Sequence, residues 1–190
     1  MKNAIILHGQ PGKEEYYDVE RPSMSNAHWF PWLQGQLLKN DIAAATPEVP
    51  FAFKPDWELW KKEVERFEIT PDTIIVGHSR GGEFWLRYLS ENKDIKAGKV
   101  ILVAPSLGWY GSDDLYFGKF NIDPDLTQRT KGLTLFHSDN DKVGIQKSVK
   151  EIRDTVKNLK YREFHLEHFT YGSMGTEKFP ELLEELINKN

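Results

Sequence analysis

One short motif in the sequence has residue types and spacing that could break acyl bonds. Residues 77–81 read Gly-His-Ser-Arg-Gly, which matches the pattern G-x-S-x-G with Ser79 at its centre. The apolar run 73–76 precedes the motif, and the apolar, helix-like segment 84–89 follows it. A serine on a sharp turn between a strand and a helix presents its hydroxyl as a nucleophile toward a carbonyl carbon. The motif therefore predicts acyl chemistry at Ser79.

The glycines around Ser79 have a geometric explanation. The chain would reverse so sharply at the serine that side chains at positions 77 and 81 would collide across the strand and the helix. Gly82 adds a third glycine. A glycine in a helix costs roughly 1 kcal/mol relative to alanine, so close backbone approach is the simplest reason for two of them here. The bare pattern also occurs by chance, and in that alternative Ser79 only caps the helix.

A nucleophilic serine needs two further groups, and both occur later in the chain. An imidazole must accept the hydroxyl proton, and a carboxylate must orient that imidazole. Asp139 and Asp141 follow one apolar run, and His165 and His168 lie at the end of another. His165 falls inside the expected strand, whereas His168 lies just beyond it, which favours His168 as the base. The spacing of the two histidines does not suit a metal pair at a strand end, so no metal is expected.

Apolar runs alternate with amphipathic segments along the chain, which is typical of α/β proteins with a parallel sheet. The expected strands are residues 4–7, 42–46, 73–76, 99–103, 133–136 and 161–166, and the expected helices are 30–39, 56–67, 81–91, 146–158 and 177–190. Asp56 is the expected N-cap of its helix, whose aromatic stripe predicts a core face. Residues 105–132 lack a helical pattern. A segment of this length is usually functional or partly structured, but it is too small for a large lid.

The composition narrows the classes of partner. At 190 residues, with 39% hydrophobic and 28% charged residues, the chain is expected to fold as one domain, residues 1–190. A formal net charge of −4 gives no general attraction to nucleic acid or anionic membranes. The absence of cysteine excludes disulfides, thiolate metal sites and a cysteine nucleophile. The first apolar run is too short for a signal peptide and no segment approaches membrane-spanning length, which predicts a soluble, cytoplasmic protein.

Four segments together resemble one known family. They are residues 76–79, residues 27–33 (Ala-His-Trp-Phe-Pro-Trp-Leu), and the pairs 168–169 (His-Phe) and 179–180 (Phe-Pro). The chain is similar, from Ile5 to Leu186, to the small serine hydrolase family that includes retinoblastoma-binding protein nine. This resemblance implies an α/β-hydrolase fold with three layers, a mostly parallel six-stranded sheet of order 2-1-3-4-5-6, helices on both faces and no large lid. It also implies a Ser-Asp-His triad that needs no cofactor.

The resemblance assigns the acid to Asp141, which leaves Asp139 as a turn former, although Asp139 stays an alternative acid. The family has a glycine before the His-Phe pair, where this sequence has Glu167. An α/β-hydrolase oxyanion hole uses one N–H after the nucleophile and one from the loop after the first strand. The backbone N–H groups of Arg80 and Gln10 are the expected donors, with a neighbour of Gln10 or a simple turn as alternatives. The Arg80 side chain is expected to be a solvated charge.

The expected substrate pocket is less specific. His8, Trp29, Trp109, Tyr110 and Phe117 are candidate lining residues, although His8 also fits a role in shaping its loop and Trp29 fits core packing equally well. The resulting hypothesis is a serine hydrolase that cleaves a small ester-like or other acyl substrate through an acyl-enzyme. The alternative is a non-catalytic protein-interaction module on the same fold.

Overall fold

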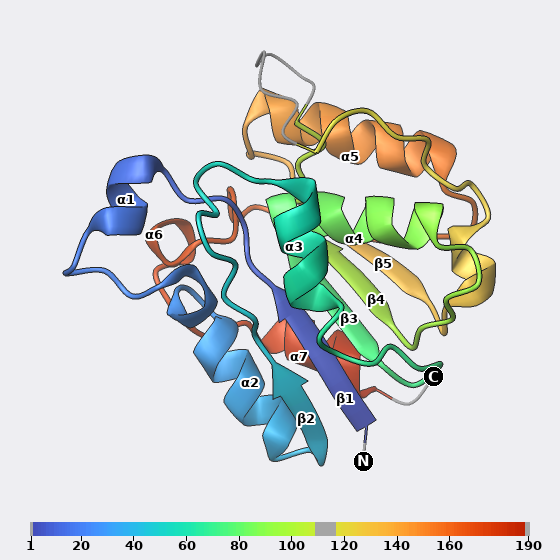
Figure 1. Ribbon diagram of the computed structural model, residues 1–190, viewed down its shortest axis with the longest axis horizontal. Helices are drawn as coiled ribbons and strands as arrows, with labels where there is room; N and C mark the ends of the chain where they lie inside the picture. The colour runs from blue at the N-terminus through green and yellow to red at the C-terminus, as the bar shows by residue number, and fades with distance from the viewer. Residues whose placement is uncertain (1, 109–116, 189–190) are drawn as a thin grey trace.

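A six-stranded, fully parallel sheet forms the centre of the molecule (Figure 1). The computed structural model describes residues 2–108 and 117–188. The strands are β1 (Lys2–Leu7), β2 (Ile42–Ala45), β3 (Ile74–His78), β4 (Val100–Val103), β5 (Leu133–Ser138) and β6 (Lys160–Phe164). Their order is β2-β1-β3-β4-β5-β6, and each neighbouring pair is parallel. The order predicted from the sequence is confirmed.

Helices cover both faces of this sheet. They are α1 (Lys13–Tyr17), α2 (Phe30–Leu38), α3 (Trp57–Val64), α4 (Arg80–Glu91), α5 (Val143–Thr155), α6 (Tyr171–Met174) and α7 (Pro180–Ile187), with 3₁₀ turns η1 (Met24–Asn26) and η2 (Leu126–Arg129). Helices α3, α4 and α5 lie on one face, and α2 and α7 lie together on the other (Figure 1). This three-layer arrangement is the α/β-hydrolase fold.

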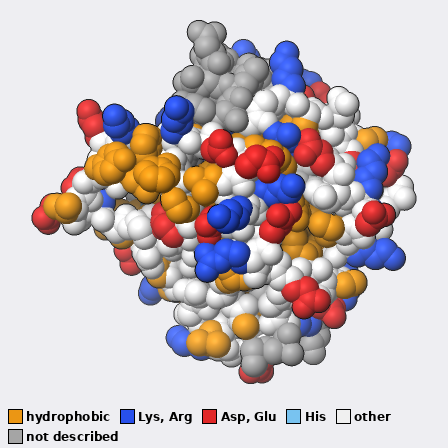
Figure 2. Space-filling view, in the orientation of Figure 1, with side chains coloured by type: hydrophobic (Ala, Val, Ile, Leu, Met, Phe, Trp, Pro, Cys, Tyr) orange, Lys and Arg blue, Asp and Glu red, His pale blue; other side chains and the backbone are white. Residues whose placement is uncertain are grey.

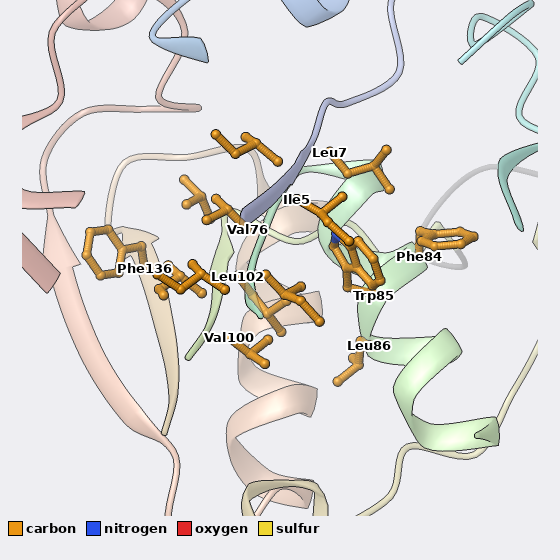
Figure 3. Close-up of a cluster of buried hydrophobic side chains, with 14 of the residues drawn as sticks. Ile5, Leu7, Val76, Phe84, Trp85, Leu86, Val100, Leu102 and Phe136 are labelled. Atoms are coloured by element: carbon orange, nitrogen blue, oxygen red, sulfur yellow. The ribbon is translucent and has the colours of Figure 1, made fainter. Parts of the chain in front are cut away.

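The core lies between the sheet and these helices. All residues of β3, β4 and β5 are buried, as expected for parallel strands covered on both faces. Figure 3 shows side chains of these strands and of β1 meeting the side chains of α4. Trp85 of α4 is fully buried in this cluster. The sheet and α4 therefore form a rigid support for whatever lies at the carboxyl ends of the strands.

The start of α3 illustrates how local sequence sets the elements. The Asp56 carboxylate accepts a hydrogen bond from the backbone N–H of Leu59 at 2.9 Å, which satisfies a free donor of the first turn. Trp60 and Val64 on the inner face of α3 are completely buried. The predicted cap and core stripe are both confirmed.

Two differences from the expected elements concern the end of β6 and the loops. Strand β6 ends at Phe164, so His165 does not lie inside it, contrary to the expectation for 161–166. The short helices α1 and α6 were not expected, because four or five residues cannot display a helical period. Between β4 and β5, the described part of the chain contains only the short turn η2. Within the described residues, no helix is long and apolar enough to cross a bilayer.

Candidate active site

Ser79 occupies a strained turn at the carboxyl end of β3. Its backbone angles are φ 52° and ψ −115°, a region that residues with a side chain rarely adopt. The Ser79 N–H donates to the carbonyl of Val103 at 2.9 Å, and the Ser79 carbonyl accepts from the N–H of Ser106 at 3.1 Å. The end of β4 and the residues after it therefore hold the peptide groups before and after Ser79, and these contacts maintain the strained geometry.

The neighbouring glycines are required by close backbone contact. A Cβ atom at Gly77 would lie 2.5 Å from the carbonyl oxygen of Gly81, and one at Gly81 would overlap the carbonyl oxygen of Leu7. A Cβ at Gly82 would lie 2.9 Å from Pro105 Cβ. The close backbone approach expected from the motif is thus found in the fold. Helix α4 can begin directly against β1 and β3 only because these positions lack side chains.

A chain of hydrogen bonds links Ser79 to His168 and Asp141. His168 Nε2 lies 2.9 Å from Ser79 Oγ, and His168 Nδ1 lies 2.9 Å from Asp141 Oδ2. This pattern assigns the proton to Nδ1, which donates to the carboxylate, and leaves Nε2 to accept from the serine hydroxyl. The other carboxylate oxygen of Asp141 accepts from the N–H of Lys142 at 2.6 Å, and the side chain is 1% exposed. The three residues proposed from the sequence are brought together.

The loop that carries His168 is attached to the turn that carries Asp141. The backbone N–H of Glu167 donates to Asn140 Oδ1 at 2.8 Å, and the N–H of Leu166 donates to Ser138 Oγ at 2.7 Å. Glu167 has φ 48°, the left-handed conformation that favours glycine. Glu167 therefore occupies a backbone region that a glycine would adopt with less strain. Sequence reasoning missed the role of Asn140, since a polar residue in a turn has no distinctive pattern.

His78 fixes the backbone of the catalytic histidine candidate. Its Nε2 donates to the carbonyl oxygen of His168 at 2.8 Å. Burial lowers the pKa of His78 well below its usual range, and the nearby His168 and His28 lower the pKa further. His78 is therefore neutral, and its Nδ1 has no hydrogen-bond partner within the described residues.

The loop after β1 lies beside the nucleophile. A Cβ atom at Gly9 would lie 3.0 Å from Ser79 Cβ, which shows how near the two turns are. His8 Nδ1 donates to the carbonyl oxygen of Gly9 at 2.7 Å, while His8 Nε2 accepts from the N–H of Val49 at 3.0 Å. Because the C=O and N–H of a trans peptide point in opposite directions, this contact directs the N–H of Gln10 away from His8.

The two expected oxyanion donors share one property, which is that neither N–H has a backbone acceptor among the described residues. Arg80 begins α4, and its N–H has no acceptor within the helix. The N–H of Gln10 follows β1 and makes no backbone hydrogen bond among the described residues. Both groups are therefore free to bind an oxygen atom.

A cavity of about 640 Å³ opens at Ser79 and His168. Its lining includes Gln10 and His28 together with the charged residues Glu15 and Glu177. His28 Nδ1 accepts from the N–H of Tyr171 at 3.2 Å, and burial lowers the pKa of His28. Sequence reasoning missed these walls because they come from irregular segments around η1 and α6.

Three expected pocket residues lie in the interior instead. His8 is completely buried, and its pKa is lowered by burial, so it acts on the loop rather than on the cavity. Trp29 is completely buried and donates its indole N–H to the carbonyl of Phe169 at 3.0 Å. Phe117 packs against Trp57 and Trp60 in the core. Large aromatic side chains suit a core as well as a pocket, which explains the wrong assignments.

Two expected residues, Trp109 and Tyr110, lie outside the described residues. Across the part of the chain that the structure describes, no cluster of three or more histidine, aspartate and glutamate side chains is placed to hold a metal ion. The hydrogen bonds from Ser79 to His168 and from His168 to Asp141 suit nucleophilic attack by a serine with an imidazole and a carboxylate beside it.

Comparison with known proteins decides the family. Residues 22–184 match the family described as "Serine hydrolase". The chain belongs to the serine hydrolase family. This result confirms the resemblance drawn from the sequence, and it identifies the protein as a hydrolase.

The relatives of this serine hydrolase support the same fold. It is 32% identical over 106 residues to the Bacillus subtilis (strain 168) protein "Putative hydrolase YdeN", and that match spans 54% of this chain and half of the relative. The crystal structure of the ydeN gene product from B. subtilis covers 98% of this chain and 97% of its own, with a TM-score of 0.81 and 23% identity. Est1E from Butyrivibrio proteoclasticus, solved with ferulic acid, covers 98% and 86%, with a TM-score of 0.64 and 14% identity.

Proposed function

We propose that this serine hydrolase cleaves a small ester-like or other acyl substrate through an acyl-enzyme on Ser79. Ser79 Oγ attacks the carbonyl carbon while His168 Nε2 takes the hydroxyl proton. The backbone N–H groups of Gln10 and Arg80 bind the oxygen on which negative charge develops. His168 then gives its proton to the leaving group, so that the ester or related bond breaks and the acyl group stays on Ser79.

The second half of the reaction uses the same groups. Water enters at the place of the leaving group and loses a proton to His168 Nε2 as it attacks the acyl carbon. The proton returns to Ser79 Oγ when the acid product departs. Asp141 keeps the imidazole in the Nδ1–H tautomer and stabilises its cation in both halves.

The observation that carries this proposal is the continuous pair of 2.9 Å hydrogen bonds from Ser79 to His168 and from His168 to Asp141. The cavity at Ser79 supports a small substrate, because its volume of about 640 Å³ lies within the usual range of small-molecule sites. The lining includes the carboxylates of Glu15 and Glu177, which a long alkyl chain would cover at a cost, so it favours a short acyl group.

The test is covalent labelling of Ser79 together with ester hydrolysis. A fluorophosphonate should add once to the wild-type protein, as read by intact mass and by peptide mapping to Ser79, and the protein should hydrolyse 4-nitrophenyl butyrate. Ser79→Ala should abolish labelling and turnover, whereas the matched control Thr155→Ala, which removes a hydroxyl at the last residue of α5, should keep both. Labelling of the alanine variant at the wild-type rate would refute the nucleophile. A wild-type protein that neither labels nor turns over would favour the interaction-module alternative.

A further inference from the structure

The side chain of Arg80 is buried beneath the nucleophile turn. Arg80 is 7% exposed, although a charged residue at this position was expected to be solvated. It does not line the cavity at Ser79, whereas Gln10 does. The guanidinium instead borders a separate recess near Ser106 and Gly108. The guanidinium of Arg80 therefore lies behind the proposed oxyanion hole, so that the side chain, unlike the backbone N–H of the same residue, can influence the substrate only through other residues.

One contact of Arg80 anchors the guanidinium. Its Nη1 contacts the carboxylate of Glu83, which lies one turn further along α4. The two side chains are 9% and 2% exposed, so the contact is shielded from water. Burial raises the pKa of Glu83, while the positive charge of Arg80 opposes that rise. A buried guanidinium without this partner would be costly, and the contact fixes where it lies.

Arg80 Nη1 also donates to the carbonyl of Ser106 at 3.4 Å, and two further donors of the guanidinium hold Gln10. Arg80 Nε and Nη2 each donate to Gln10 Oε1 at 3.3 Å. At the other end of the same amide, Gln10 Nε2 donates to the carbonyl of Phe53 at 3.1 Å. Both ends of the Gln10 side chain are therefore fixed, although its loop belongs to no helix or strand.

The surroundings of the guanidinium are shaped to admit it. A Cβ atom at Gly108, which has φ 80°, would overlap Arg80 Nη1. The ring of Phe117 has its centre 5.9 Å from the guanidinium carbon. Gly108 and Phe117 therefore enclose the guanidinium closely, and the Arg80 side chain fills the space between them.

We propose that Arg80 is a positioning residue, whose guanidinium, anchored by Glu83, fixes Gln10 so that the Gln10 N–H remains aimed at the carbonyl oxygen of the substrate. This inference rests on the proposed function. Oxyanion donors stabilise a transition state only when they are already in place, because reorganisation during the reaction reduces their effect. Arginine can place two donors on one acceptor, and lysine cannot reproduce that geometry.

The first experiment measures kcat and KM separately for Arg80→Met with 4-nitrophenyl butyrate. Loss of a complete oxyanion donor lowers kcat by about 100–1000-fold, and a misplaced donor should keep part of its effect, so we expect a fall of roughly 10–100-fold in kcat and little change in KM. The control is Arg66→Met, which removes an exposed ion pair with Glu63 of the same three-residue spacing. The control should stay within about twofold in kcat.

The second experiment separates positioning from stability. Arg80→Lys restores a charge beside Glu83, so its unfolding temperature should exceed that of Arg80→Met while kcat stays low. Gln10→Met should lower kcat in the same way, and the Arg80→Met/Gln10→Met pair should be no worse than the more damaged single variant, because both changes disrupt one contact. If Arg80→Met does not fold, the kcat values of Arg80→Lys and Gln10→Met test the positioning role.

Different outcomes would overturn different claims. Recovery of wild-type kcat in Arg80→Lys, or fully additive losses in the double variant, would refute the positioning role and leave the proposed reaction intact. Absence of Ser79-dependent turnover in the wild-type protein would refute both.

Discussion

Asp139 and His165 form a second aspartate–histidine pair beside the one that reaches Ser79. His165 Nδ1 lies 2.7 Å from Asp139 Oδ1, with the two side chains 76% and 52% exposed. The Asp141–His168 pair joins the same two turns, but its carboxylate is buried and its imidazole contacts the serine. The alternative acid suggested by the sequence is therefore engaged by a different histidine on the surface.

The two aspartates should differ sharply in their effect on turnover. Asp141→Asn should lower kcat by about four orders of magnitude, because an amide cannot hold the imidazole in the required tautomer or stabilise its cation. Asp139→Asn should change kcat less than about tenfold, since it touches only the exposed His165. Ester hydrolysis by both purified variants, with circular dichroism to confirm folding, measures this. A more damaged Asp139→Asn enzyme would show that Asp139, and not Asp141, is the acid.

Glycine at position 167 should give a more stable protein than alanine at the same position. Glu167 holds φ 48°, which costs a residue with a side chain roughly 1–2 kcal/mol, and part of that is offset by the greater chain entropy of glycine. We expect Glu167→Gly to raise the free energy of unfolding by about 1 kcal/mol relative to Glu167→Ala, which keeps the same strain. Chemical denaturation of the two variants compares them directly. An alanine variant as stable as the glycine variant would show that the strain is absent.

The free energy of unfolding should fall as the pH is lowered, because His78 is buried in its neutral form. Its folded pKa lies well below the usual histidine value of about 6.5, so the unfolded chain binds more protons below that pH and unfolding is favoured there. The drop in unfolding temperature between pH 7.5 and pH 5 should be smaller in His78→Phe than in the wild type. His165→Phe, at an exposed histidine, is the matched control and should keep the full drop. An unchanged drop in His78→Phe would contradict the argument.

Features governed by local pattern could be predicted from the sequence. The strands of the buried sheet were found because apolar runs such as Val100–Val103 are covered on both faces. Ser79, Asp141 and His168 were identified because the motif and the family fix their order along the chain. The parallel sheet then brings the three loops to one edge, since they all follow carboxyl ends of strands.

The remaining features depend on contacts between distant residues. Nothing in the sequence distinguishes a solvated Arg80 from one buried against Gln10, which is 70 residues away. Trp29 and Phe117 were assigned to the pocket because an aromatic residue can line a cavity or fill a core, and only the fold decides. His165 was placed in a strand because the alternation of side chains continues past the point where hydrogen bonding with β5 stops.

The glycine contacts at the nucleophile turn also bear on how this protein could be diversified. Gly77 and Gly81 have main-chain atoms of other segments where a methyl group would go, and main-chain atoms cannot rotate out of the way as side chains do. In a mutational library that varies these two positions, most members would be unfolded or inactive. Variation directed instead to exposed lining positions such as Asn26 and Tyr171 would alter the cavity while leaving the backbone of the turn intact. New substrate preferences should therefore be sought along the irregular segments, with the turn held constant.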